Sequence, residues 1–314
     1  MKNYVGIDIG GMTIKGMIIS EEGEILASGS IKTGCENGGL AMCENIIELT
    51  QRLYKESGAD KKDTVGVGVG CPGVIDSENG EVVFAGNLNL KNFPLTLILG
   101  KQLGLPIKIT NDANAAALGE AKFGAGKDYK DSVMVTLGTG VGGGIVIGGK
   151  LFEGNKSAGA EIGHMVIERF GERCSCGRRG CFEAYASASA LMKHTRLAME
   201  NNPGSDMWNT YTLETVTGKT PFDYCEQDIA AREVVDWYLR YLACGLTNIA
   251  NIFRPEIIMI GGGVSEQGEK LTKPLQQLVN QEILGGSDYA PVKIVKATLG
   301  SKAGALGAAA LVMQ

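Results

Sequence analysis

The chain lacks the features that would direct it to a membrane or to a nucleic acid. It contains no run of about 18 uncharged apolar residues that could span a bilayer, and no tract of clustered lysine and arginine. The strand-like run that begins at Tyr4 leaves no room for a signal peptide. A formal net charge of -5 attracts neither nucleic acid nor an anionic membrane. We therefore expect a cytoplasmic protein with small-molecule partners, and no nucleic acid or membrane among them.

The composition is that of a folded globular protein. A hydrophobic content of 44% in 314 residues is enough for one large domain or for two lobes. The 46 glycines lie largely at the ends of apolar strand-like runs, where they favour binding turns. Of the eight cysteines, five are scattered and three gather at Cys174, Cys176 and Cys181, which points to a metal rather than to a disulfide framework.

Apolar periodicity predicts an α/β protein in which a second lobe repeats the layout of the first. The expected strands are 4–9, 13–20, 25–31, 65–69, 107–110, 132–137, 144–147 and 256–260. The expected helices are 40–53, 113–122, 187–200, 228–253 and 303–313. Residues 201–221 are polar and contain Pro and Gly, so we expect an excursion near the surface there.

The first candidate site is the turn Asp8-Ile-Gly-Gly-Met-Thr-Ile-Lys15, which lies between two strand-like runs. Glycines in such a turn let backbone N–H groups approach a phosphate without interference from a Cβ. Asp8 could hold Mg²⁺, directly or through water. By itself, however, the segment is just as compatible with an ordinary glycine hairpin.

The second candidate is the glycine-rich segment Leu137–Gly144. It contains a G-x-G-x-x-G match, but a dinucleotide fold requires a helix after the glycines and a strand-like run follows here. A G-x-x-x-x-G-K match ends at Lys150, yet Leu151 stands where a P-loop needs Ser or Thr. The remaining interpretation is a strand–glycine–strand turn that binds phosphate. Its similarity to the N-terminal turn supports this interpretation for both turns.

The third candidate is a metal site formed by His164, Cys174, Cys176 and Cys181. Thiolates and one imidazole, with glycines that bend the chain, suit tetrahedral Zn²⁺ in a closed structural site. The alternative is a set of reduced or disulfide-linked cysteines, and a reducing compartment favours the metal.

The fourth candidate is a set of acids and amides: Asn111-Asp112, Glu161 and Glu183, with His164 close by. A sugar ring needs several hydrogen-bonding groups, and phosphoryl transfer needs one carboxylate near the attacking hydroxyl group. Each residue alone is a weak indication. Asp112 at a helix start is by default an N-cap, and Glu183 is by default a solvated acid.

Taken in order, five segments resemble the ROK family of repressors, open reading frames and kinases. The segments are Asp8-Ile-Gly-Gly, Asn111-Asp-Ala-Asn-Ala-Ala-Ala-Leu-Gly-Glu120, Leu137-Gly-Thr-Gly-Val-Gly-Gly-Gly144, Glu161-Ile-Gly-His164 and Cys174-x-Cys-Gly-x-x-Gly-Cys-x-Glu183. The resemblance covers nearly the whole chain. It implies an actin-like ATPase (ribonuclease H-like) α/β fold with two lobes, each with a mixed five-stranded sheet, that close on sugar and ATP in a central cleft, usually in a homodimer. We expect an N-terminal lobe of residues 1–110 plus 299–314, and a C-terminal lobe of residues 111–298 that carries the zinc-binding loop.

The resemblance also implies roles for single residues. Asp112 matches the catalytic base, and His164 would bind zinc with one ring nitrogen and a sugar hydroxyl with the other. The implied sugar ligands are Gly73, Asn87, Asn111, Asp112, Glu161, His164 and Glu183. The implied ATP-binding residues are Asp8, Gly10, Gly11, Thr13, Lys15, Thr139, Gly140, Gly262 and Gly263. In one departure from the family pattern, Met12 stands where most relatives have a threonine, and it cannot donate a hydroxyl group to a phosphate.

The function expected from the resemblance is transfer of the ATP γ-phosphoryl group to the 6-hydroxyl of a hexose. Glucose comes first because the runs Glu161–Met165 and Cys181–Ser187 together resemble the glucokinase branch, with N-acetylmannosamine and allose as alternatives. Mg²⁺ and the glycine turns would offset charge on the phosphates, while zinc would order the loop of His164 and Glu183. A sugar-responsive repressor of the same family is a rival, opposed by the lack of a basic helix-turn-helix segment before Asp8. A catalytically idle sugar-binding protein is a second rival.

Overall fold

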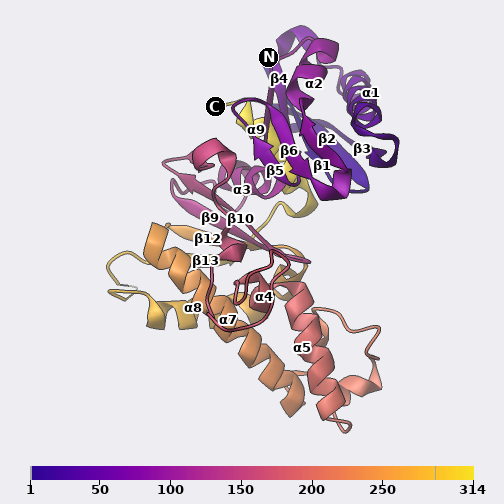
Figure 1. Ribbon diagram of the computed structural model, residues 1–314. Helices are drawn as coiled ribbons and strands as arrows, with labels where there is room; N and C mark the ends of the chain where they lie inside the picture. The colour runs from indigo at the N-terminus through magenta and orange to yellow at the C-terminus, as the bar shows by residue number, and fades with distance from the viewer. Residues whose placement is uncertain (1, 287) are drawn as a thin grey trace. The chain divides into compact units, whose positions relative to one another are not determined.

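The computed structural model describes residues 2–286 and 288–314, and by contacts the chain divides into two compact units (Figure 1). Unit 1 contains the residues up to Asp131, Gly144–Ala160 and Thr298–Gln314. Unit 2 contains Ser132–Gly143 and Glu161–Ala297. The C-terminal helix therefore belongs with the N-terminal part of the chain.

A mixed five-stranded sheet with the order β3-β2-β1-β4-β8 forms the centre of unit 1. Neighbours among β1, β2 and β3 run antiparallel, whereas β4 runs parallel to both β1 and β8. The strands are β1 (Asn3–Ile9), β2 (Thr13–Ser20), β3 (Ile25–Lys32), β4 (Thr64–Cys71) and β8 (Ile107–Asn111). The meander and the parallel layer expected from the sequence are thus confirmed.

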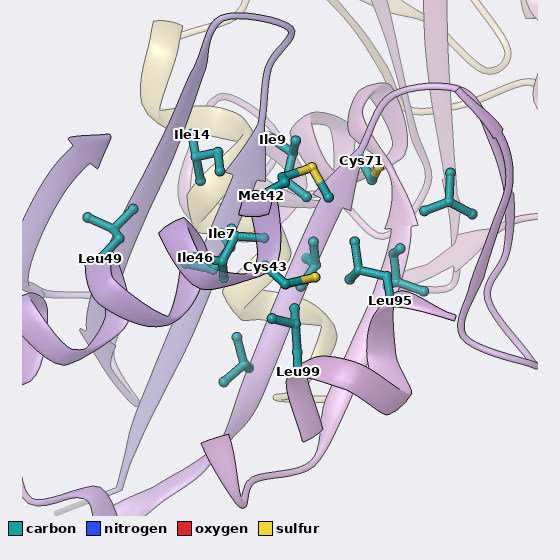
Figure 2. Close-up of a cluster of buried hydrophobic side chains, with 14 of the residues drawn as sticks. Ile7, Ile9, Ile14, Met42, Cys43, Ile46, Leu49, Cys71, Leu95 and Leu99 are labelled. Carbon is teal, nitrogen blue, oxygen red and sulfur yellow. The ribbon is translucent and has the colours of Figure 1, made fainter. Parts of the chain in front are cut away.

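Helices cover both faces of this sheet. On one face α1 (Gly39–Ser57) and α2 (Leu95–Leu103) bury their apolar sides against the strands, as Figure 2 shows. On the other face α9 (Ala303–Leu311) packs on β1 and β4. Gly6 and Gly68 are required beneath α9, because a Cβ at either position would collide with a helix carbonyl oxygen. Alternate side chains of β1 therefore pack into two separate cores, one on each face of the sheet.

A small antiparallel sheet in unit 1 was not expected from the sequence. It consists of β5 (Val74–Asp76), β6 (Glu81–Ala85) and β7 (Leu90–Phe93), in that order. Strands of three to five residues are too short to show a period of two in the sequence. This sheet carries Gly73 and Asn87 on its connections.

The second five-stranded sheet, β11-β10-β9-β12-β13, repeats the strand order of the first. Its strands are β9 (Ser132–Leu137), β10 (Val141–Ile147), β11 (Lys150–Phe152), β12 (Ile257–Gly261) and β13 (Lys293–Lys296). The helices of unit 2 are α4 (Glu183–Ala186), α5 (Ala188–Asn201), α6 (Thr220–Tyr224), α7 (Ile229–Phe253) and α8 (Glu269–Glu282). The expected repeat of layout is confirmed, although β10 begins three residues before the strand predicted from Gly144.

The surface excursion expected over residues 201–221 is only partly correct. Met207 and Val216 in this segment are buried, and they pack with Met199 and Ala231 in a small core of unit 2. The polar, Pro- and Gly-containing composition concealed these two apolar residues, because they are isolated and show no periodicity.

The lobe boundary expected at residues 110/111 stays a prediction. By contacts, α3 (Asp112–Phe123) belongs with unit 1, because it packs closely on α9. Gly119 and Gly307 permit this approach, since a Cβ on either would meet the backbone of the other helix. In the described part of the chain, no helix is both long and apolar enough to cross a membrane.

Candidate functional site

Two aspartates lie at the carboxyl ends of parallel strands in unit 1. Asp8 is near the end of β1, Asp112 follows β8 directly, and β4 runs between these strands. A Cβ placed on Gly70 of β4 would lie 3.8 Å from Asp8 Oδ1 and 3.7 Å from Asp112 Cα. The two acidic residues therefore flank a position where the absence of a side chain leaves room between them.

Burial makes both carboxylates costly to ionise. It raises the pKa of Asp8 to about 6, with a further rise from the charge of Asp112 and an opposing effect of Lys15. Burial also raises the pKa of Asp112, against a lowering effect of the hydrogen bond from the Ala113 N–H. The pKa of the Cys71 thiol rises as well, first through burial and then through both aspartates. Such a pair is suited to take up a proton or a divalent cation.

The helix cap beside Asp112 differs from the default expectation by one residue. The N-cap of α3 is Asn111, whose Oδ1 accepts from the Ala113 N–H at 2.8 Å. Asp112 Oδ1 accepts from the same N–H at 2.9 Å, and Asn111 Nδ2 donates to the Gly73 carbonyl at 3.2 Å. Asn111 thus joins the start of α3 to the connection that carries Gly73.

The N-terminal glycine turn is closed by a residue that the sequence analysis missed. Within the turn, the Gly10 N–H donates to the Thr13 carbonyl at 3.0 Å. The buried Thr33 donates its hydroxyl to the Gly10 carbonyl at 2.6 Å and its N–H to the Met12 carbonyl at 3.0 Å. Thr33 is 23 residues from Gly10, so no local pattern could have indicated it. The Met12 side chain is 87% exposed.

Asn87 and Gly11 lie close together, and Cys35, which the sequence did not indicate, contacts the backbone of both. A Cβ placed on Gly11 would be 3.8 Å from Asn87 Nδ2. The Cys35 thiol donates to the carbonyl oxygens of Gly11 and Asn87 at 3.7 and 3.8 Å. Unit 1 therefore brings an implied phosphate turn next to an implied sugar ligand.

Lys15 lies on β2, opposite Asp8 in the register of the sheet. Its ammonium group donates to the Ser301 carbonyl at 3.2 Å, just before α9. A Cβ on Gly304, in the first turn of α9, would lie 2.6 Å from the Asp8 carboxyl carbon. Lys15 and the start of α9 thus both lie beside Asp8, and both carry positive charge or partial charge.

The second glycine turn follows β9 in unit 2. The Gly138 N–H donates to the Gly140 carbonyl at 3.0 Å, with Thr139 between them. Gly262, which follows the parallel strand β12, has φ +82 and lies against Leu137, where a Cβ would collide with the backbone. The implied ATP-binding residues of unit 2, with Gly263 next in sequence, are therefore gathered at neighbouring strand ends.

His164, Cys174, Cys176 and Cys181 converge as the sequence predicted, with their four ligand atoms all within 4.8 Å of one another. Cys176 Sγ and Cys181 Sγ are 3.7 Å apart, and Cys174 Sγ is 3.6 Å from His164 Nδ1. Tetrahedral zinc with its usual bond lengths places two sulfurs about 3.8 Å apart, and sulfur and nitrogen about 3.6 Å apart. These cysteines are free, so the donor set fits a metal rather than a disulfide.

Glu183 is not the solvated acid of the default expectation. One carboxylate oxygen accepts from the Val141 N–H at 3.1 Å. The other accepts from the Ser175 hydroxyl at 2.8 Å and from the Cys174 thiol at 3.5 Å. Glu183 therefore links the second glycine turn to the cysteine loop.

Glu161 and His164 lie on one short turn before the cysteine loop. The turn is the 3-10 helix Ile162–His164, and the His164 N–H donates to the Glu161 carbonyl at 3.0 Å. His164 directs Nδ1 toward Cys174, which leaves Nε2 as the nitrogen for a second partner, while Glu161 is exposed.

Comparisons with known proteins agree on one family. The model of the ROK family matches residues 4–314. A glucokinase of Halalkalibacterium halodurans is 38% identical, and the match covers 99% of this chain and 95% of that protein. The crystal structure of a ROK family glucokinase from Streptomyces griseus, in complex with glucose and AMPPNP, is 33% identical with a TM-score of 0.79 and 98% of each chain covered. A xylose repressor of Caldicellulosiruptor bescii is 30% identical, with 99% of this chain but only 78% of the repressor covered. The actin-like ATPase fold with two mixed five-stranded sheets is thereby confirmed.

Proposed function

The chain belongs to the ROK family, and from this premise we propose that it transfers the γ-phosphoryl group of ATP to the 6-hydroxyl group of a hexose, glucose first. The observation that carries the proposal is the half-buried pair Asp8 and Asp112, whose pKa values burial raises, beside a closed glycine turn in unit 1. The chain also spans 95% of a glucokinase, against 78% of a repressor. The match therefore leaves a smaller share of the glucokinase unaligned than of the repressor.

Asp112 is the proposed general base. It would accept the proton of the sugar hydroxyl as the oxygen attacks phosphorus. Burial raises the pKa of its carboxyl group, which makes the carboxylate a stronger base than an exposed aspartate. The hydrogen bond from the Ala113 N–H holds the carboxylate in one orientation at the start of α3.

Asp8 and the glycine turns are the proposed phosphate region. Mg²⁺ bound to ATP supplies charge that offsets the phosphates, and Asp8 is the carboxylate that would hold it. Backbone N–H groups of the two turns would take phosphate oxygens. The proposed ATP-binding residues are Asp8, Gly10, Gly11, Thr13, Lys15, Thr139, Gly140, Gly262 and Gly263.

The proposed sugar ligands are the residues that the family resemblance implies. They are Gly73, Asn87, Asn111, Asp112, Glu161, His164 and Glu183. Amides, carboxylates and one imidazole match the hydroxyl groups of a hexose, since each hydroxyl both donates and accepts. Ser175 and Val141 would hold the Glu183 carboxylate in place for such a role.

We propose one structural zinc per chain at His164, Cys174, Cys176 and Cys181. The support is the fit of the 3.7 and 3.6 Å ligand separations to a tetrahedron. Zinc would order the loop that carries His164 and Glu183, without taking part in the chemistry. Metal analysis of the purified protein should find zinc at one equivalent; freely titratable thiols without zinc would contradict the site.

The substrate test is an assay of ADP release over a panel of sugars. Glucose, mannose, allose, fructose, N-acetylglucosamine and N-acetylmannosamine cover the alternatives. A site that hydrogen-bonds a hydroxyl discriminates against its epimer, so glucose should exceed allose by about tenfold or more in kcat/KM. A higher kcat/KM on allose or N-acetylmannosamine would overturn the choice of glucose. No turnover of any sugar that binds would favour the idle sugar-binding protein, and sugar-dependent DNA binding would favour the repressor.

Two further expectations stay predictions. We propose a homodimer, in line with the family pattern, which sedimentation of the purified protein would test. The cytoplasmic location follows from the sequence composition alone and would be tested by fractionation of the source cells.

A further inference from the structure

The carboxylate of Glu153 ties together the ends of two strands in unit 1. Its Oε1 accepts from the Thr110 hydroxyl at 2.6 Å, and its Oε2 accepts from the Ser77 hydroxyl at 3.2 Å. Thr110 is fully buried on β8 and directly precedes Asn111, the last residue of that strand, and Asp112, the first residue of α3. Ser77 directly follows β5. Glu153 itself lies just after β11, on the loop of residues 153–160 that leads into Glu161.

The same loop is held at further points. The Ser77 N–H donates to Ser157 Oγ at 3.3 Å, and the hydroxyl groups of Ser77 and Ser157 bond to each other. Across the base of the loop, the Gly159 N–H donates to the Glu153 carbonyl at 2.8 Å. The loop is therefore fastened to the strand ends by side chains rather than by a β-ladder.

The backbone of this loop needs such fastening. Lys156, Ser157 and Ala160 have φ of 50, 57 and 62, a left-handed conformation that residues other than glycine seldom adopt. Strained conformations of this kind persist only where the surroundings hold them. The side-chain hydrogen bonds to Glu153 and Ser157 hold the loop from outside, in addition to its own backbone bonds.

We propose that Glu153 is a positioning residue for sugar binding. It holds the loop of residues 153–160 to the strand end that carries Asn111 and precedes Asp112, and so fixes both the end of β8 and the backbone that leads into Glu161. Glu153 acts through Thr110, Ser77 and the loop, not by contact with the sugar. The inference rests on the proposed function, because it takes Glu161 and Asn111 as sugar ligands.

The test compares Glu153→Ala with Glu153→Gln and with Glu78→Ala, a change at an exposed glutamate next to Ser77. Glu153→Ala should raise the KM for glucose about tenfold and leave the KM for ATP within about twofold, with kcat reduced less than KM is raised. Glu153→Gln keeps an acceptor for Thr110 and gains a donor for Ser77, so it should recover most of the glucose affinity. Glu78→Ala should match the wild type.

A merely structural role gives a different result. An equal rise in the KM for glucose and for ATP, or a glucose KM within about twofold of wild type, overturns the proposal. If Glu153→Ala does not fold, Thr110→Val removes the hydrogen bond between Thr110 and Glu153 alone, and its glucose KM decides in the same way.

Failure of the proposed function can be told apart from failure of the positioning role. If the wild type phosphorylates no hexose, the function is wrong, and the fastening is then judged by hydrogen exchange. Glu153→Ala should speed amide exchange in residues 154–161 while the strands of unit 1 stay protected. Unchanged exchange in that loop overturns the fastening itself.

Discussion

The carboxylate pair of unit 1 and the cysteine–histidine cluster of unit 2 are built in opposite ways. Asp8 lies near the end of the central strand β1 and Asp112 directly follows the edge strand β8 of a five-stranded sheet, with packed helices on both faces. The cysteine loop, residues 165–182, contains no helix or strand and only two isolated bridges, Val166 to Cys181 and Arg173 to Arg179. The carboxylate pair is supported by a packed core, whereas the cysteine–histidine cluster is supported by turns.

The two clusters therefore differ in what fixes their geometry. A sheet edge keeps its geometry when a side chain on it changes, because the backbone bonds and the core remain. A loop held by four ligands loses its geometry when one ligand is lost, since metal binding and folding are coupled. Changes in unit 1 should therefore alter chemistry, and changes in the cysteine loop should alter stability and sugar binding together.

The sharpest separation is expected from Asp112→Asn. The amide keeps the shape of the side chain but cannot accept the proton, so kcat should fall by about 10²-fold or more. Glucose binding, measured by calorimetry, should persist, and the melting temperature should change little. Near wild-type turnover would mean that another group is the base, whereas joint loss of sugar binding would make Asp112 a substrate ligand foremost. Asp128→Asn, at an exposed position, is the control.

Cys176→Ser should have the converse effect. Loss of one zinc ligand should lower the melting temperature on the order of 10 °C and weaken glucose binding with it, because the loop supplies both. Zinc content and thermal unfolding are measured on the same preparation. Cys225→Ser changes a cysteine outside the cluster and should keep both zinc and stability. A variant that loses zinc but melts and binds glucose as the wild type does would show that the metal supports neither stability nor sugar binding.

The pH dependence of stability tests the cost of burying Asp8. Its pKa is raised from 3.8 to about 6, so the folded state holds this proton more tightly than the unfolded state. The resulting stabilisation is complete below pH 3.8 and is lost as the pH rises through about 6. Asp8→Asn removes the buried charge and should gain stability over wild type between these values, approaching about 3 kcal/mol above pH 6 without added Mg²⁺.

Denaturant unfolding from about pH 4 to about pH 8 measures the gain in the free energy of unfolding from Asp8→Asn. The exposed Asp128→Asn should show no such trend. If the difference in the free energy of unfolding between Asp8→Asn and wild type does not change with pH, burial does not destabilise the ionised Asp8 carboxylate.

The smallest effect concerns Ala160, at the junction where the chain leaves unit 1. Its φ of 62 suits glycine, so Ala160→Gly should stabilise the protein by about 1 kcal/mol. Ala158 has φ -97, and Ala158→Gly should instead destabilise by roughly 0.5 to 1 kcal/mol through added freedom of the unfolded chain. Opposite signs of the two changes in denaturant unfolding are expected; equal signs would contradict the strain.

Local patterns in the sequence were enough to predict much of the framework. Strand and helix positions followed from apolar periodicity, because burial of one face is a local pattern in the sequence. The glycine turns were visible for the same reason, and the metal ligands were visible because three of them lie within eight residues, Cys174 to Cys181. The family resemblance added roles that no single motif carried.

The distant groups that support these motifs can be identified only in the folded structure. Thr33 closes the glycine turn from 23 residues away, Glu153 reaches Thr110 across 43, and the Val141 N–H holds Glu183 across 42. The buried Met207 also became part of a core that its polar surroundings concealed. A hydrogen-bond partner is chosen by the folded path of the chain, and a side chain far off in sequence leaves no periodic trace of that choice.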